Sequence, residues 1–427
     1  MMIHKLENDL ERRKQAKKDF YFSSIGILVK KTRLKKKLTQ ENVARGICSN
    51  TYLSKFEHNT VPINEEYLSL IMERIDIGYN NFMLPDEMID SFMTALDCFI
   101  NDDKERYETL IHGMKTVEFA VLVDIARLGY YVINNNQKEA ETTADELYHY
   151  LQSMEGDALG VYMLFNAGAR MINFHFDEGL KILNLFNQID SYSDDLVGII
   201  AYLKFICYGN LGMMNYSRNC ADEARMEFTK TKNYRRLAMI DLHLLEFTFY
   251  ESGLLPQLDN ESFLKLLNQE ERDLYHLLMG KSEIESIKNF DMIGSESPFY
   301  SEMLFSKCIY LKAMKIEDDY LETKSILKTV CNQRSSKVDY HHWLNLIELK
   351  IQYEMKEFMA ETILPYALSR QSFYLMKIAT NEIVSYLARS KRYKEALQYV
   401  AKLENDLAHL QGNKKPIGAI VPLPEFK

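Results

Sequence analysis

Long apolar segments are absent from this sequence. No run of 18 apolar residues occurs among its 427 residues, whereas a helix that crosses a membrane needs about 20. The first nine residues, Met-Met-Ile-His-Lys-Leu-Glu-Asn-Asp, are also too highly charged for a secretory signal. We therefore expect a cytoplasmic protein with no contact with a membrane.

Clustered cysteines and the common catalytic motifs are also absent. The six cysteines are widely scattered, with no CxxC pair and no histidines at ligand spacing, so we expect buried reduced thiols and no metal site. His341 and His342 would point in different directions on one helix and make a poor metal site. No GxxxxGKS/T, GxGxxG, HExxH or GxSxG motif occurs. We therefore expect neither a cofactor nor an enzymatic activity.

Positive charge is concentrated at the N-terminal end. Residues 1–45 contain 13 lysines and arginines and five acidic residues, a net charge of +8, although the whole chain has a net charge of -9. The remaining residues therefore have a net charge of -17. Because the basic end attracts phosphate and the acidic remainder repels it, we expect nucleic acid to contact only the N-terminal region.

Residues 25–57 have the pattern of a helix-turn-helix. A first helix over residues 25–37 would carry six outward cations, Lys30, Lys31, Arg33, Lys35, Lys36 and Lys37, which suits phosphate contacts. Thr39 is placed to cap the next helix, and Ser49 or Asn50 to cap the last one. Gly46 lies near a helix end, where a left-handed residue is common.

The last helix of this pattern would leave a short polar face exposed. Such a face suits contacts with base edges and phosphates in a major groove of DNA. The residues that we expect to contact DNA are Lys35, Lys36, Lys37, Thr39, Gln40, Asn50, Thr51, Ser54 and Lys55.

Residues 24–77 resemble the lambda-repressor/Xre class of helix-turn-helix domains. Within them, the stretches Leu-Thr-Gln, Gly-Ile-Cys-Ser and Tyr-Leu-Ser-Lys-Phe-Glu are similar to the RRNPP family of peptide-pheromone receptors of Gram-positive bacteria. The resemblance covers about an eighth of the chain. It implies a DNA-binding domain, a helical-repeat domain that binds a short linear signalling peptide, and a homodimer that reads two half-sites of double-stranded operator DNA.

Composition predicts four segments. Residues 1–22 form either a charged helical lead-in or a basic arm near the DNA backbone. Residues 23–80 form the helix-turn-helix domain, and residues 81–411 form an all-α domain for peptide sensing and dimerisation. Residues 412–427 contain three prolines and cannot form a helix, so they are either a disordered end or an extended strand against the repeats.

We expect the long third segment to be a superhelix of tetratricopeptide-like repeats. Only three prolines interrupt residues 86–411, and apolar residues recur there at helical spacing. Residues 383–399 resemble a tetratricopeptide hairpin, while residues 300–330 and 340–367 keep the length of a hairpin without the consensus. Such hairpins stack because they cannot bury their apolar faces alone, and stacking creates a concave inner surface.

Polar stripes on apolar helices are the candidates for a peptide-binding surface. They lie on helices expected over residues 161–174 and 340–353, and a third begins near Asn381. Asparagine can donate to and accept from an extended peptide backbone, and arginine can hold a carboxylate. Alternatively, each stripe is the solvated face of an amphipathic helix. The expected peptide-binding residues are Tyr162, Asn166, Arg170, Asn173, Asn345 and Asn381.

The function that these patterns favour is transcriptional regulation by a DNA-binding protein under the control of a signalling peptide, as in quorum sensing. Two alternatives stay open. The acidic helical region is similar to Rap-type proteins, some of which bind response regulators and promote their dephosphorylation, although no catalytic glutamine or glutamate can be carried over. The other alternative is a phage or plasmid repressor without a peptide ligand.

Overall fold

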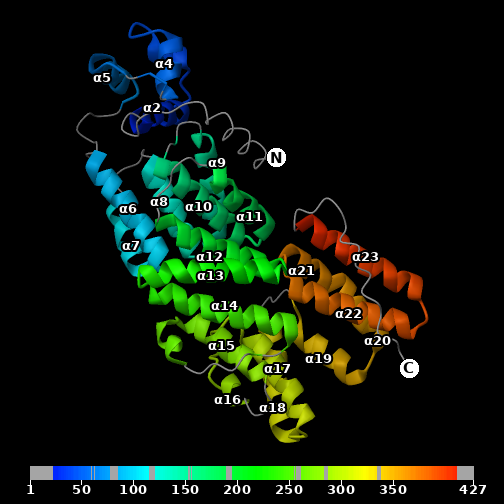
Figure 1. Cartoon of the computed structure of the whole chain (residues 1–427). Helices are drawn as coiled ribbons and strands as arrows, with labels where there is room; N and C mark the ends of the chain where they lie inside the picture. Colours follow the sequence, from blue (N-terminus) through cyan, green and yellow to red (C-terminus); the bar gives the residue numbers. More distant parts are fainter. Residues whose placement is uncertain are drawn as a thin grey trace. The chain divides into compact units, whose positions relative to one another are not determined.

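Helices make up all the regular secondary structure in the part of the chain that the structure describes, and no strand occurs there (Figure 1). This computed structural model describes residues 23–58, 60–61, 63–76, 85–114, 121–151, 154, 156–188, 195–253, 255, 261–282, 287–333 and 338–410. The expected all-α fold is confirmed. The lead-in of residues 1–22 and the tail of residues 412–427 lie outside the described residues.

The chain divides into two compact units, residues 1–204 and residues 205–427. The division falls inside one helix, α12. The expected boundary between the DNA-binding domain and the repeats falls between α5 and α6, mostly on residues outside the described ranges, and it stays a prediction. The helices of the first unit and the shared helix are α2 (Ser23–Lys35), α3 (Gln40–Ala44), α4 (Asn50–Glu57), α5 (Glu65–Arg74), α6 (Pro85–Asn101), α7 (Lys104–Gly113), α8 (Val121–Ile133), α9 (Gln137–Tyr148), α10 (Gly156–Ile172), α11 (Phe176–Asn184), η5 (Leu185–Gln188) and α12 (Asp195–Asn210).

Helices α2 to α5 pack around a hydrophobic core of their own, and we call the described residues between 23 and 76 the head. Apolar side chains from all four helices meet in this core because each helix has one apolar face. Tyr52 on α4 is only half-buried at the edge of the head. The fully buried members of the core are Val29, Val43, Ala44, Leu53, Phe56, Leu68, Ile71, Met72 and Ile75.

A buried ion pair joins three helices of the head. The guanidinium of Arg33 donates to both carboxylate oxygens of Glu57, at 2.6 and 2.8 Å, and to the carbonyl oxygen of Leu38 at 3.0 Å. Gln40 donates a further hydrogen bond to Glu57 at 2.7 Å. Glu57 is fully buried. The expectation that Arg33 points outward is therefore wrong, because its planar fork matches this carboxylate.

Lys31 also differs from its expected outward position. Its ammonium forms an ion pair with Asp124 on α8, and Arg127 approaches the same carboxylate at 3.3 Å. Burial is the main reason why the pKa of Lys31 falls to about 8, and the nearby Arg127 also lowers it. Lys31 is thus engaged within the first unit, whereas Lys35, Lys36 and Lys37 are exposed.

The second unit is also built from helices. They are α13 (Met214–Lys230), α14 (Tyr234–Ser252), η6 (Glu261–Leu266), α15 (Gln269–Ser282), α16 (Ile287–Phe290), α17 (Tyr300–Ala313), α18 (Glu317–Gln333), α19 (Tyr340–Leu349), α20 (Gln352–Phe358), η7 (Met359–Ile363), α21 (Leu364–Ser369), α22 (Phe373–Arg389) and α23 (Tyr393–Leu410). Two expected hairpins are confirmed, as α17 with α18 and as α22 with α23, and each pair lies in contact.

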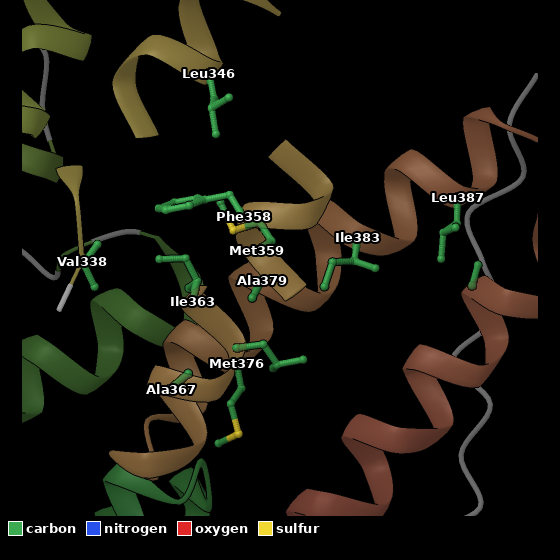
Figure 2. Packing of buried hydrophobic residues seen from close by; sticks show 12 residues of the cluster. Val338, Leu346, Phe358, Met359, Ile363, Ala367, Met376, Ala379, Ile383 and Leu387 are labelled. Atoms are coloured by element: carbon green, nitrogen blue, oxygen red, sulfur yellow. The ribbon is translucent and has the colours of Figure 1, made fainter. Parts of the chain in front are cut away.

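The third expected hairpin, residues 340–367, differs from the prediction. Its first helix ends at Leu349, because Lys350 takes a left-handed backbone conformation with φ 52°. This conformation costs a residue with a Cβ about 1–2 kcal/mol. Burial of the following segment offsets that cost, since Phe358, Met359 and Ile363 are packed in the core shown in Figure 2.

A π-helical turn lies within the continuous helical segment of residues 352–369, which we call the rod. Residues 359–363 form this turn between α20 and α21, so the helical path continues from Gln352 to Ser369. Pro365 occupies the first turn of α21. Proline lacks an N–H, and its ring clashes with the carbonyl four residues earlier in a regular α-helix. The wider turn accommodates the proline without ending the helix.

The core around this rod contains side chains from α19 to α23 (Figure 2). Met376, Ala379 and Ile383 lie on one face of α22 at helical spacing and contact the π turn and α21. The fully or nearly buried members of this cluster are Val338, Leu346, Phe358, Met359, Ile363, Leu364, Ala367, Met376, Ala379, Ile383, Leu387 and Ala396.

Gly212 and Gly253 form a matched pair for testing the packing of the second unit. Their φ values are +74° and +73°, so alanine is strained at both. A Cβ on Gly212 would also lie 2.5 Å from Cγ of Phe373, whereas a Cβ on Gly253 meets nothing within 4 Å. We expect Gly253→Ala to lower the free energy of unfolding by about 1–2 kcal/mol, and Gly212→Ala by about 1–3 kcal/mol more.

Urea unfolding of the full chain, followed by the fluorescence of Trp343, measures this difference. Trp343 is the single tryptophan and lies in the second unit. Equal losses for the two variants would contradict the packing of α22 against this turn.

The buried ion pair of the head gives a second prediction. Arg33→Ala leaves Glu57 buried without its charged partner, so we expect a loss of about 3–5 kcal/mol in the stability of the head. Lys36→Ala removes an exposed pair with Asp76 at 2.9 Å, which should cost less than about 1 kcal/mol. Hydrogen exchange of residues 40–57 in the full chain reports the stability of the head. Similar protection in both variants would show that the buried pair does not hold the three helices together.

Candidate functional site

Two N-cap hydrogen bonds and a left-handed glycine define α3, α4 and the connection between them. The hydroxyl of Thr39 accepts from the backbone N–H of Asn42 at 3.1 Å, and the hydroxyl of Ser49 accepts from that of Tyr52 at 3.1 Å. Both are N-cap bonds, so Thr39 and Ser49 act as expected. Gly46 has φ +76°, as expected for a left-handed turn residue. These contacts fix the start of α4.

The exposed face of α4 carries short polar side chains. Asn50, Thr51 and Lys55 are exposed, and Ser54 is half-buried beside them. Lys35, Lys36 and Lys37 are also exposed, at the end of α2 and just after it. The nine residues expected to contact DNA therefore fall into an exposed group and a group with structural roles. Thr39 caps α3, and Gln40 donates to the buried Glu57.

The polar stripe expected on residues 161–174 lies mostly in the interior of the first unit. Tyr162 is fully buried and donates to the carbonyl oxygen of Ala144 at 3.1 Å, and Asn166 donates to the Tyr162 hydroxyl at 3.3 Å. Arg170 binds Asp145 at 2.8 Å. Burial raises the pKa of the Tyr162 phenol. The structure thus brings these side chains together between α9 and α10, and their contact with a peptide stays a prediction.

The other expected peptide contacts are on separate surfaces. Asn173 donates to the carbonyl oxygen of Ala169 at 3.0 Å. Asn345 is half-buried, and its amide nitrogen lies 3.5 Å from Nδ1 of His341. Asn381 is exposed on α22. Neither Asn345 nor Asn381 lines the pocket of the second unit, and their role in peptide binding also stays a prediction.

A pocket of about 560 Å³ lies in the second unit. Its walls come from α15, α17, α19, α20, the π turn and α22, together with residues 350–351. Such a volume is typical of ligand sites, and the lining combines apolar and aromatic side chains with five charged ones. The lining residues are Lys281, Glu302, Phe305, Ser306, Ile309, Tyr340, Trp343, Leu346, Ile347, Lys350, Ile351, Gln352, Met355, Met359, Tyr374, Leu375, Ile378, Glu382, Ser385, Tyr386 and Arg389.

Aromatic rings form one wall of this pocket. The rings of Tyr340 and Trp343 are nearly parallel, at 10°, with centroids 6.2 Å apart, and Phe305 lies 5.1 Å from Trp343. On α22, Tyr374 stacks on Tyr250 of α14 with centroids 4.2 Å apart. Packed rings of this kind offer a large rigid apolar surface to a ligand.

An ion pair neutralises one end of the pocket. Lys281 binds the carboxylate of Glu302, and the hydroxyl of Tyr340 donates to the same carboxylate at 3.4 Å. Burial raises the pKa of Tyr340, and the negative charge of Glu302 adds to this effect. Burial also raises the pKa of Tyr374. At neutral pH both phenols are therefore protonated and can donate hydrogen bonds.

This pocket is not among the sites that the sequence patterns predict. Its lining residues are spread from Lys281 to Arg389, and no single stripe contains more than a few of them. The aromatic pair at Tyr340 and Trp343 was the local signal that could have indicated it. These rings share a helix with His341 and Asn345, the polar stripe that was chosen instead.

The described ranges contain neither a cluster of metal ligands nor a membrane-spanning helix. Those residues hold no group of three or more histidine, cysteine, aspartate or glutamate side chains that could bind a metal ion. No described helix is both long enough and apolar enough to span a bilayer.

Comparisons with known proteins were made on the sequence and on the fold. No protein-family model and no curated protein matches the sequence. The apo form of the quorum sensor NprR from B. thuringiensis is similar in structure, with a TM-score of 0.53 and 13% identity over 75% of this chain and 99% of that chain.

Two further solved structures match less closely. PlcR of Bacillus thuringiensis, in complex with the peptide PapR7 and DNA, is 13% identical with a TM-score of 0.26, over 75% of this chain and 97% of that one. ComR of S. thermophilus, in complex with DNA and its signalling peptide ComS, is 12% identical with a TM-score of 0.24, over 72% and 99%. The likeness to NprR shows that this chain has the helical fold of a solved quorum sensor.

Proposed function

We propose that this chain is a regulator of transcription that binds operator DNA through its head and a short linear signalling peptide in its second unit. The observation that carries the proposal is the pairing of two features in one chain. One is an exposed, polar recognition face on α4, and the other is the aromatic-walled pocket of the second unit. The fold shared with the quorum sensor NprR supports the same conclusion.

The head supports DNA binding by geometry and charge. Asn50 and Thr51 occupy the first turn of α4, which is the part of a recognition helix that reaches base edges. Lys35, Lys36 and Lys37 are exposed nearby in sequence and can neutralise phosphates. One such helix reads too few bases for useful specificity, so the proposal includes a homodimer that reads two half-sites.

The pocket supports a peptide ligand by size and chemistry. Ile347, Met355 and Ile378 provide apolar surface, and polar groups lie at both ends. Peptide binding changes DNA binding only if the peptide prefers one arrangement of the two heads over another. We place this regulator in the cytoplasm, where operator DNA and an imported peptide meet.

The DNA prediction separates base reading from phosphate contact. A site is first selected from random-sequence duplexes with the full chain. Replacing Asn50 and Thr51 with alanine should lower the preference for the selected site about tenfold or more, because bidentate base contacts are worth about 1–3 kcal/mol. Replacing Lys35, Lys36 and Lys37 with alanine should weaken selected and scrambled duplexes about equally. It should also lower the salt slope by about 0.9 for each lost phosphate contact.

Fluorescence anisotropy at several salt concentrations measures both effects. Lys391→Ala with Lys394→Ala and Lys402→Ala is the matched control, since it also removes three lysines and all three are exposed at the other end of the chain. The proposal fails for DNA if no duplex is enriched, or if Asn50 and Thr51 can be removed without loss of preference.

The peptide prediction tests whether the ligand contacts the apolar wall of the pocket at Ile378. The full chain is equilibrated with random heptapeptides, half with free carboxyl ends and half amidated, and bound peptides are identified by mass. Ile378→Asp adds an unpaired carboxylate to the apolar wall, so it should weaken an enriched peptide at least tenfold. Ile326→Asp is the control, because Ile326 is partly exposed on α18 and does not line the pocket.

Titration of each protein, followed by Trp343 fluorescence, gives the affinities. The enriched peptide should also change the affinity of the wild type for its selected duplex, and it should leave that of Ile378→Asp nearly unchanged. Absence of any enriched peptide would refute the ligand part of the proposal, and an unchanged DNA affinity would refute the switch.

A further inference from the structure

Two cations at one end of the pocket have no acidic partner among the described residues. Lys350 and Arg389 both line the pocket and are exposed, and neither forms an ion pair or a side-chain hydrogen bond within the ranges that the structure describes. In contrast, Lys281 at the other end is paired with Glu302. The pocket is therefore electrically asymmetric along its length.

Lys350 and Arg389 belong to the same end of the pocket. The ring of Tyr353 lies 6.3 Å from the ring of Tyr386, centroid to centroid, so the start of α20 meets the last turns of α22. Lys350 precedes Tyr353 by three residues, and Arg389 follows Tyr386 by three. Because residues three apart on a helix share a face, Arg389 lies one turn beyond this contact.

The length of the pocket follows from α22. The lining residues of this helix run from Tyr374 to Arg389, which is about 22 Å at 1.5 Å per residue. An extended peptide rises about 3.3 Å per residue, so about seven residues fill this length. A heptapeptide therefore reaches from the paired Lys281 and Glu302 to the unpaired cations.

Glu382 determines where a negative charge on the ligand can lie. It lines the pocket on α22, about 10 Å before Arg389, and has no ion pair within the described part of the chain. A carboxylate in the middle of the pocket would be repelled by Glu382, whereas one at the end would lie near Lys350 and Arg389. Charge complementarity thus favours a carboxylate at one end of the ligand.

We propose that the pocket selects a linear peptide of about seven residues that is apolar along its middle and places a carboxylate between Lys350 and Arg389. This inference rests on the proposed function and adds the direction and the terminal chemistry of the ligand. Arginine can hold the carboxylate by two parallel hydrogen bonds, and Lys350 adds a second positive charge. The carboxylate is either the free C-terminus or a terminal aspartate or glutamate side chain.

The experiment uses three separate random heptapeptide pools with the full-length protein. The first pool has free carboxyl ends, the second is amidated and contains no aspartate or glutamate, and the third is amidated with glutamate fixed at position 7. We expect enrichment from the first or third pool, and the pool identifies the source of the carboxylate. The second pool should give no peptide within about tenfold of that affinity, because it lacks the charge-assisted bonds.

The variants test the two cations directly. Arg389→Ala with Lys350→Ala should weaken the best carboxylate peptide about tenfold or more and leave its amidated, uncharged counterpart nearly unchanged. Lys391→Ala with Lys394→Ala removes the same charge from exposed positions outside the pocket and should change neither. Arg389→Glu with Lys350→Glu should instead favour peptides that end in an amidated lysine. The Trp343 emission of each free variant verifies that the pocket is folded.

The outcomes separate this inference from the proposed function. Equal enrichment from the free-acid and amidated pools, or equal losses in the pocket and control variants, overturns the carboxylate assignment while peptide binding stands. No enrichment from any pool overturns both.

Discussion

The stacked rings of Tyr250 and Tyr374 join α14 to α22, two helices that are distant in the sequence, and the pocket depends on this contact. Beside it, the ammonium of Lys377 donates to the carbonyl oxygen of Glu251, 126 positions earlier, at 3.4 Å. Every lining residue before α22 belongs to the chain between these two points. Closing so long a loop has an entropic cost that rises only slowly with length. The core of Figure 2 stabilises the α22 side of this closure.

Local patterns predicted the parts of the structure that local interactions determine. The all-α fold, the cap at Thr39 and the left-handed Gly46 follow from contacts within a few residues, and the structure confirms them. The pocket could not be predicted in this way, because its lining residues, from Lys281 to Arg389, come from helices that are distant in the sequence and packed together in the fold. The break at Lys350 had no glycine or proline to indicate it, and burial of the following rod decides it.

In the head, too, a contact between residues distant in the sequence decides the role of a side chain. Arg33 lies among exposed lysines in the sequence, and its charge alone predicts a phosphate contact. Its partner, Glu57, follows 24 residues later and is fully buried, so Arg33 is a structural residue. The head therefore keeps α4 in place with one cation while others, such as Lys37, stay exposed. The sequence predicted that the cations of α2 point outward, which is wrong for Arg33 and for Lys31, since both form ion pairs within the first unit.

The π turn determines which face of α20 lines the pocket. Residues 359–363 contain one residue more than an α-helical path between the same points would need. Deleting that residue would return the rod to α-helical geometry and rotate α20 by about 100° relative to α21. Met355 would then turn away from the pocket, while the core contacts of α21 would stay in place. A change of a single residue in length, with no change in composition, could thus give this fold a different ligand surface.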